Sequence, residues 1–209
     1  MNPNSAAKIS TANEAGSSPH MTTWVVCVVA AIGVAVLAQY LSPAVTEWLR
    51  WEHTASFSQG WRPVTGHFVH LSATHGAFNI AAILLVWRLF LKDWQQGDVL
   101  LMALSIPLTG LLLFLADLHW YVGFSGVLHG WFLLGAVRVW HAQKIFAAAL
   151  VLGLLLKLWF EPNNPFAASE AEMIGGPIAY VAHQLGVLAI VILLFFHFAS
   201  IPLWDRVRR

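Results

Sequence analysis

Long apolar stretches separated by short polar segments dominate this sequence. Each stretch approaches the roughly 20 residues that a membrane-spanning helix needs. The pattern therefore predicts an all-α polytopic membrane protein with six transmembrane helices. The predicted spans cover residues 23–41, 67–91, 99–116, 122–140, 145–160 and 177–200, of which the fifth is short and carries Lys157.

The two ends of the chain differ in composition from this membrane domain, which covers residues 23–200. Residues 1–22 are rich in Ser, Asn and Ala, which predicts a flexible cytoplasmic tail. Residues 201–209 form a second, basic cytoplasmic tail. An alternative is that the first span is a signal peptide, because residues 36–38 read Val-Leu-Ala and would permit cleavage. Its length and the single Lys before it favour a retained helix.

The composition indicates a lipid environment. Hydrophobic residues make up 58% of the 209 positions and charged residues only 10%, whereas soluble domains carry about 25% charge. The eleven Trp residues suit anchoring at the membrane interface. A formal net charge of +1 and the lack of a long basic block argue against nucleic-acid binding. The single cysteine, Cys27, excludes an intrachain disulfide and a Cys-x-x-Cys metal site.

Lys and Arg are distributed unequally between the two sides of the predicted spans. With the N-terminal tail in the cytoplasm, Arg50 and Arg62 fall in outside loops and Lys157 lies near the outer end of the fifth span. Both termini are therefore expected in the cytoplasm, with residues 42–66 and 161–176 outside. The other basic residues then face the cytoplasm, as the positive-inside rule requires: Lys8, Arg88, Lys92, Arg138, Lys144, Arg206, Arg208 and Arg209.

Several polar side chains fall at membrane depth, where they are costly and usually functional. In the second span, His75 and Asn79 are four residues apart and share a helix face. In the fourth span, Ser125 and His129 have the same spacing, and the sixth span carries His183. Taken singly, each His would suit ordinary packing, and the Ser would suit a bond to its own helix. Their combination indicates a site.

Glycines accompany these polar residues. Gly126 and Gly130 lie on or beside the face that carries Ser125, and Gly186 follows one turn after His183. Small residues four positions apart let transmembrane helices approach closely, so packing alone would explain the first two.

The polar residues supply the parts of a covalent hydrolysis site. A serine hydroxyl needs a neighbouring base, usually His, and the oxyanion needs donors such as Asn amides or His N–H groups. Ser125 lies near the outer start of its span, where free helix N-terminal amides add positive potential. None of the ten acidic residues falls in the apolar part of the second, fourth or sixth span, and Asp117 is the nearest. The sequence therefore favours a Ser–His dyad over a triad with an acid.

Three segments together resemble the signatures of the rhomboid intramembrane serine proteases. They are "WRPVTGHFVHLSATHGAFN" at 61–79, "GFSG" at 123–126 and "AHQLG" at 182–186, and they occur in the family's order on the expected spans. The resemblance covers roughly residues 23–200 and implies a six-transmembrane-helix rhomboid-like bundle.

The resemblance also implies a part for each matching residue. Ser125 would be the nucleophile and His183 its general base, while His75 and Asn79 would line the oxyanion hole. A substrate helix would approach between the second and fifth spans. The remaining matches would be structural: Trp61 and Arg62 in an outside loop, His70 near the outer mouth, Gly123 in the tight entry to Ser125, and Gly126 and Gly186 in the helix contact.

His129 departs from the common family pattern, which has Tyr four residues after the nucleophile. This variant and the compact body resemble the rhombosortase subfamily, whose substrates carry a C-terminal Gly-Gly, transmembrane and basic sorting tail. His129 would support His183 by stacking or a hydrogen bond, or would itself be the base. Ile190 also departs, since many relatives have a small residue there, and looser packing of the sixth span on the fourth is expected.

The function expected from the resemblance is an intramembrane serine endopeptidase that cleaves such tails from exported proteins. It would lie in the bacterial inner membrane, open to the periplasmic side, use no cofactor or metal, and accommodate an accessory membrane partner. One alternative is a catalytically inactive rhomboid-like membrane chaperone. Another is a His-ligated metal or haem protein, suggested by ten His residues but lacking an intramembrane carboxylate or thiolate cluster to complete a zinc site.

Overall fold

The computed structural model describes residue 33, residues 42–95 and residues 97–200. The chain divides into two units, Met1–Val34 and Ala35–Arg209, and the elements α2 to α9 lie in the second. Both predicted tails lie outside the described residues, as does the span predicted at 23–41 apart from Gly33. Those assignments stay predictions.

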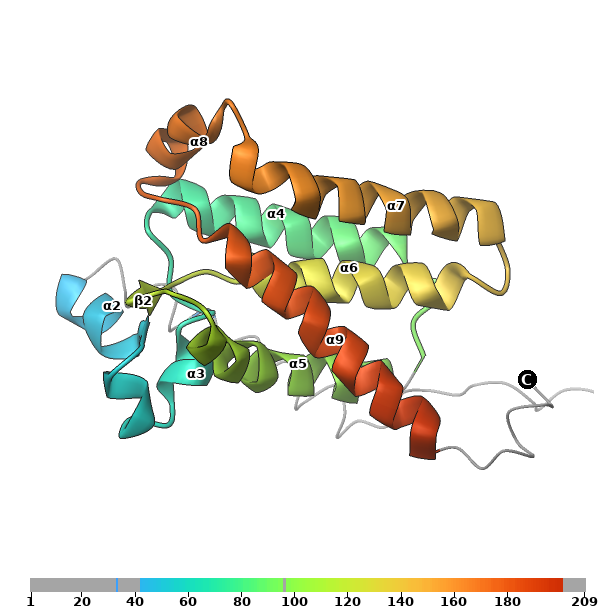
Figure 1. Ribbon diagram of the computed structural model, residues 1–209, viewed down its shortest axis with the longest axis horizontal. Helices are drawn as coiled ribbons and strands as arrows, with labels where there is room; N and C mark the ends of the chain where they lie inside the picture. Colours follow the sequence, from blue (N-terminus) through green and yellow to red (C-terminus); the bar gives the residue numbers. More distant parts are fainter. Residues whose placement is uncertain (1–32, 34–41, 96, 201–209) are drawn as a thin grey trace, which may run out of the picture. The chain divides into compact units, whose positions relative to one another are not determined.

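Five long helices correspond to the other five predicted spans (Figure 1). Three segments within the described ranges are long and apolar enough to cross a membrane, namely Asp98–Leu115, Lys144–Asn163 and Tyr180–Ala199. The chain is therefore a mostly helical membrane protein, and a total of six crossings remains a prediction. The five helices are α4 (Ala73–Leu89), α5 (Asp98–Leu112), α6 (Ser125–Val139), α7 (Lys144–Phe160) and α9 (Tyr180–Ser200).

Two of these helices are short for a membrane span. Helices α4 and α6 have 17 and 15 residues, or about 25 Å and 22 Å, against a hydrocarbon core of roughly 30 Å. Helices α5 and α7 have 15 and 17 residues, but 3-10 turns extend them to Leu115 and Asn163. Helix α4 begins six residues later than the predicted span, because Ser72 caps it and accepts the His75 backbone N–H at 3.1 Å.

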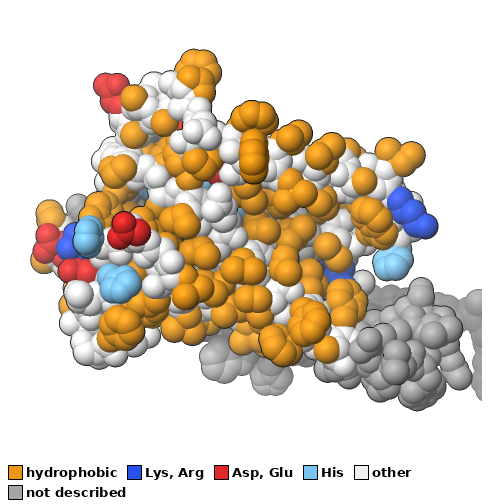
Figure 2. Space-filling view, viewed as in Figure 1, with side chains coloured by type: hydrophobic (Ala, Val, Ile, Leu, Met, Phe, Trp, Pro, Cys, Tyr) orange, Lys and Arg blue, Asp and Glu red, His pale blue; other side chains and the backbone are white. Residues whose placement is uncertain are grey.

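Large hydrophobic side chains cover the outside of the helices. Figure 2 shows them across most of one face, while the charged and His side chains lie mainly toward its two ends. In water such a surface would be unfavourable, but it matches the solvent that lipid chains provide. Exposed examples from three helices are Leu84, Leu85, Ile145, Leu152, Trp159, Phe195 and Phe196.

Helices α6 and α9 cross in close contact because glycines line both sides of the crossing (Figure 1). A Cβ atom at Gly186 would collide with the carbonyl oxygen of Gly126, and one at Gly126 would lie 2.7 Å from the carbonyl oxygen of Ala182. The expectation of looser packing at Ile190 is wrong. Ile190 is fully buried, and its Cγ1 would lie 2.9 Å from a Cβ at Gly130.

Polar contacts join α5 to α6 within the bundle. Arg138 donates from Nε to Asp98 Oδ1 at 2.8 Å, and both side chains are almost fully buried. Trp131 donates to Ser105 Oγ at 3.0 Å. Because a buried charge is costly without a partner, the Arg138–Asp98 pair fixes the two helices relative to each other.

The segment between residues 42 and 66 is more ordered than an extended loop. Its two-residue strand β1 pairs antiparallel with β2, with Trp51 opposite Tyr121 and Glu52 opposite Trp120. The all-α prediction missed this small sheet. The shorter elements are α2 (Pro43–Leu49), β1 (Trp51–Glu52), η1 (Ala55–Phe57), α3 (Arg62–Thr65), η2 (Leu113–Leu115), β2 (Trp120–Tyr121), η3 (Glu161–Asn163) and α8 (Ala167–Ile174).

Arg62 organises this segment from a buried position. Its NH1 group donates to the backbone carbonyls of Glu47 at 2.9 Å and Arg50 at 2.7 Å, and its Nε donates to Gln59 Oε1 at 2.6 Å. Trp61 is partly exposed, and its Nε1 donates to the Trp48 carbonyl. The two residues therefore belong to one folded loop, and the depth of that loop in a membrane stays a prediction.

Candidate active site

Ser125 is the first residue of α6, at the point where the chain turns into the helix. Gly123 has a φ of +116°, a conformation that residues with a side chain rarely adopt. Its N–H donates to the Gly66 carbonyl at 3.0 Å, and a Cβ there would meet the His75 ring at 2.8 Å. Only glycine therefore permits this turn, and the turn presents the Ser125 side chain at the helix N-terminus.

His183 lies in the first turn of α9 and faces Ser125 across the glycine-lined crossing. Its Nε2 lies 3.0 Å from Ser125 Oγ, and the side chain is buried. The structure thus brings the predicted nucleophile and base within hydrogen-bonding distance. The close approach of α6 and α9 is what makes this distance possible.

Glu161 is a third member of the cluster that the sequence analysis did not identify. It lies at the start of η3, immediately after α7, and its Oε2 lies 2.9 Å from His183 Nδ1. Its other carboxylate oxygen forms an ion pair with Lys157, one turn earlier on α7. The other polar residues of the site lie in the second, fourth and sixth predicted spans, whereas this acid follows the fifth. The arrangement is Ser–His–Glu, and a dyad alone does not describe it.

His129 packs flat against His183. The two ring centroids are 4.1 Å apart and the planes are inclined by 16°. The Nδ1 of His129 donates to the Ser125 backbone carbonyl at 2.7 Å, so its Nε2 carries the lone pair and lies 3.9 Å from Glu161 Oε1. The stacking interpretation agrees with this geometry. The two ring nitrogens of His129 are directed at the Ser125 carbonyl and toward Glu161, whereas His183 Nε2 lies at Ser125 Oγ.

His75 reaches the same site from α4. The Leu71 N–H points at its Nδ1 at 3.3 Å, so the ring proton belongs on Nε2 and is free to donate elsewhere. Asn79 is buried one turn further on, and its Nδ2 donates to the His75 carbonyl at 3.0 Å. Of these two residues, His75 lines the cavity beside Ser125 and Asn79 does not.

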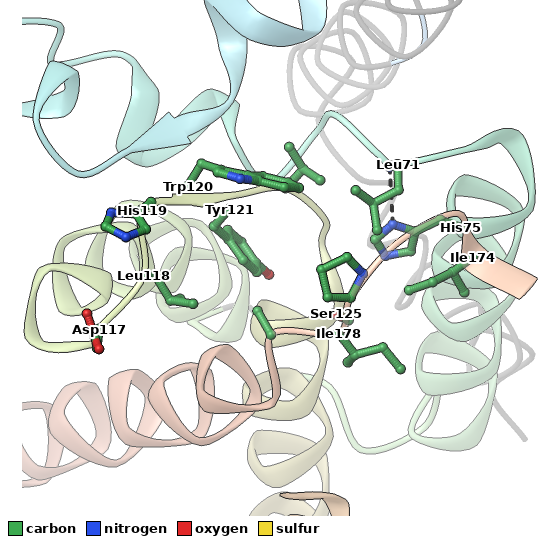
Figure 3. A pocket seen from close by; sticks show the side chains of 13 residues that line it. Leu71, His75, Asp117, Leu118, His119, Trp120, Tyr121, Ser125, Ile174 and Ile178 are labelled. Atoms are coloured by element: carbon green, nitrogen blue, oxygen red, sulfur yellow. Dashed lines mark hydrogen bonds between the residues drawn. The ribbon is translucent and has the colours of Figure 1, made fainter. Parts of the chain in front are cut away.

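A cavity of about 250 Å³ opens beside Ser125. Figure 3 shows His75, Ser125 and Tyr121 around it, together with Ile174 at the end of α8 and Ile178 between α8 and α9. The Tyr121 hydroxyl donates to the Gly123 carbonyl at 2.6 Å, and burial raises the pKa of Tyr121 to about 12. The cavity thus joins the Ser125 hydroxyl, the His75 imidazole and apolar walls.

Two buried histidines lie outside the helices that border the site. His67 packs edge-on against Tyr121, and burial lowers its pKa to about 4. His70 packs edge-on against His75 with ring centroids 5.1 Å apart, and burial, aided by the charge of His75, lowers its pKa to about 4. Both are therefore neutral near pH 7, and their rings pack against neighbouring aromatic rings.

Among the described residues, His129, Glu161 and His183 also meet the spacing of a metal site, with ligand atoms within 4.8 Å of one another. The structure thereby supplies the carboxylate that the sequence analysis found lacking. However, Lys157 already pairs with Glu161, and both ring nitrogens of His183 have partners. A cation would have to displace the Lys157 ammonium, so we interpret the cluster as a hydrogen-bonded network.

A serine at a helix start, with a buried histidine at its hydroxyl and an acid behind the histidine, is an arrangement that serine hydrolases use. Residues 58–200 match the family model of the rhomboid domain, and the chain belongs to the rhomboid family. Proteins of this family are generally intramembrane serine proteases. A search of curated proteins gave no match to the chain.

Proposed function

We propose that this protein is an intramembrane serine endopeptidase in which Ser125 is the nucleophile and His183 the general base. The observation that carries the proposal is the 3.0 Å distance between Ser125 Oγ and His183 Nε2 at the edge of a cavity. The short helix α6 supports it as well. A helix of about 22 Å is shorter than the hydrocarbon core, so at least one of its ends lies inside the core, and the proposal places the Ser125 end there.

In the first step, the Ser125 oxygen attacks the carbonyl carbon of the scissile peptide bond. A new C–O bond forms, the carbonyl π electrons move onto its oxygen, and the hydroxyl proton passes to His183 Nε2. His183 can accept this proton because its other nitrogen, Nδ1, carries the proton that Glu161 accepts.

The negative oxygen needs donors that are already in position. Ser125 is the first residue of α6, so its backbone N–H has no carbonyl of an earlier helical turn as a partner. This N–H and the positive end of the helix dipole are available to stabilise the oxyanion. The free Nε2–H of His75 borders the same cavity. A donor of this kind contributes about 10²- to 10³-fold in kcat in other serine hydrolases.

Collapse of this intermediate breaks the C–N bond. The proton on His183 Nε2 moves to the leaving nitrogen, and the substrate's new C-terminal carbonyl stays on Ser125 as an ester. Water, or an amine, then attacks the ester while His183 takes its proton. The Ser125 oxygen leaves with that proton, which restores the resting site.

An apolar crevice is the proposed route for a substrate helix. A cavity of about 390 Å³ lies between α4, α6 and α7, bordered by Leu85, Leu128, Leu154 and, at its polar end, His129 and Lys157. Helices α4 and α7 correspond to the second and fifth predicted spans. Glycine residues in a substrate would help it unwind here, since each destabilises a helix by about 1 kcal/mol relative to Ala.

The proposed substrates are exported proteins whose C-terminal tail contains Gly-Gly, one transmembrane helix and basic residues. Support for this subtype comes from His129, which replaces the usual Tyr and stacks on His183. The proposed location is the bacterial inner membrane with the site open to the periplasm and both termini in the cytoplasm.

The test is processing of a Gly-Gly-tailed reporter in cells that produce the full chain. Ser125→Ala and His183→Ala should each abolish release of the tail while the protein accumulates in the membrane. Matched controls are Ser169→Ala, an exposed serine on α8, and His141→Ala, an exposed histidine between α6 and α7. Both controls should process the reporter normally. Full processing by Ser125→Ala would end the proposal.

A further inference from the structure

The contacts of Glu161 within its own helix do not account for its burial. It is buried at the C-terminal end of α7, where the helix dipole disfavours a negative charge. Its pair with Lys157 runs from Lys to Glu at i, i+4, which is the weaker order for such a pair. Burial of a carboxylate beside apolar helices is unfavourable unless strong partners compensate. Its position therefore depends on its partners.

Those partners use both carboxylate oxygens. Oε2 accepts from His183 Nδ1 at 2.9 Å, while Oε1 pairs with the Lys157 ammonium, whose side chain is half exposed beside the crevice between α4 and α7. Lys157 thus holds the carboxylate from one side, so that its second oxygen faces the imidazole.

We infer that Glu161 is a positioning residue that, together with Lys157, completes a Ser125–His183–Glu161 triad. The inference rests on the proposed protease function. By accepting the Nδ1 proton, Glu161 keeps the Nε2 lone pair directed at Ser125 and stabilises the imidazolium that forms during attack. His129 restricts the same ring through its face. The histidine is therefore fixed at one nitrogen by an acid and at its face by a second imidazole.

Several titratable or polar groups face His183 from the elements around it. Ser125 and His129 come from α6, Glu161 from η3, His75 from α4 and Tyr180 from α9 itself, with Lys157 of α7 behind Glu161. Of these, Glu161 is the acid in contact with an imidazole nitrogen. Its removal should therefore make the imidazolium harder to form, which shifts the pH dependence of Ser125 reactivity.

The experiment measures the rate at which a fluorophosphonate labels Ser125 between pH 5 and 9 in the purified full chain. Glu161→Gln should react at least about tenfold more slowly near pH 7, with the midpoint of its acid limb at lower pH than in the wild type. Glu161→Asp should recover part of the rate. Glu172→Gln, the same change at an exposed position on α8, should match the wild type.

A wild-type rate and pH profile in Glu161→Gln would overturn the inference. A lower yield of folded Glu161→Gln protein that reacts with the wild-type rate and pH profile would also overturn it, because Glu161 would then contribute to folding alone. If the wild-type chain itself is not labelled at Ser125, the proposed function fails instead.

A measurement on the wild-type chain tests the inference even if Ser125 is not labelled or if Glu161→Gln does not fold. Nitrogen-15 NMR of labelled histidines, assigned by comparison with His183→Ala and followed to high pH, should show the neutral form of His183 with its proton on Nδ1 and a bare Nε2. A neutral form with its proton on Nε2 would overturn the inference.

Discussion

The rings of His129 and His183 lie face to face, 4.1 Å apart and inclined by only 16°. One ring hydrogen-bonds to the Ser125 carbonyl and the other to the Ser125 hydroxyl. Both histidines therefore contact the same serine. The stack restrains the face of the His183 ring, in addition to the hydrogen bonds at its two nitrogens. This relationship gives His129 a packing contact at the position where the family resemblance leads one to expect Tyr.

The stack predicts that shape matters more than titration at position 129. His129→Tyr should keep most of the activity, because a phenol ring can also stack on His183. His129→Ala should slow the reaction by about 2- to 12-fold, the rate equivalent of an aromatic pair worth about 0.5–1.5 kcal/mol. The measurement is the labelling rate of Ser125, with His141→Ala as the exposed control. Equal labelling rates in wild type and His129→Ala would refute the conclusion that the His129 ring supports His183.

The contact between α6 and α9 predicts a strong effect of one methyl group. In Gly186→Ala the new Cβ would meet the carbonyl oxygen of Gly126, so the helices must separate. Such overpacking typically costs 1–3 kcal/mol of unfolding free energy, and here it also moves His183 away from Ser125. Unfolding in mixed micelles should show the loss, and Ser125 labelling should fall with it.

Gly153 offers the matched control for that change. It lies inside α7, and a Cβ there would meet nothing within 4 Å. Gly153→Ala should leave stability unchanged or raise it by up to about 1 kcal/mol through helix propensity. If both alanine variants behave alike, the close helix contact does not hold the site together.

The buried His67 predicts that the protein loses stability in mild acid. Its pKa is lowered from 6.5 to about 4 in the folded chain, so the unfolded chain binds a proton more readily in this range. The stabilisation is complete above pH 6.5 and is lost as the pH falls toward 4. The free energy of unfolding in detergent should therefore decrease between pH 6.5 and 4.

A variant separates His67 from the other titrating groups. His67→Phe keeps a ring against Tyr121 but cannot titrate, so the decrease with acid should become shallower. It should not vanish, because the pKa of His70 is lowered to about 4 as well. His141→Phe, at an exposed position, should keep the wild-type slope. An unchanged slope in His67→Phe would show that this residue does not couple to folding.

The hydrogen-bonded cluster predicts that the reaction does not depend on a metal ion. Both ring nitrogens of His183 have partners, and Lys157 neutralises Glu161. Treatment with EDTA should therefore leave the rate of Ser125 labelling unchanged. Loss of labelling after EDTA, with recovery on adding zinc, would instead identify His129, Glu161 and His183 as metal ligands.

The sequence predicts the long helices well because their apolar length outweighs other local signals. It also places Ser125 and His183 on the correct helices through their glycine-containing motifs. It does not predict the pairing of β1 with β2, because two-residue strands have no measurable periodicity. Nor does it predict the start of α4 at Ala73, where the His75 N–H donates a capping bond to the Ser72 hydroxyl.

Glu161 illustrates what a helix-by-helix search misses. It lies 22 residues before His183, outside the spans that carry the other polar groups, and only the packing of α7 near α9 brings the two together. One signal was available in the sequence. Lys157 is the lone charge in the fifth span and has an acid four residues later, where a buried pair would be expected. Spacing alone cannot show that the acid's second oxygen contacts a histidine.

The pairing of Ser125 with His183 is the claim on which the remaining conclusions depend. Its most direct test is peptide mass spectrometry of the purified full chain after reaction with a fluorophosphonate, which reports the modified residue. We predict a single adduct on Ser125 that is absent in both Ser125→Ala and His183→Ala. An unmodified Ser125 in folded wild-type protein, or equal modification in His183→Ala, would contradict the pairing.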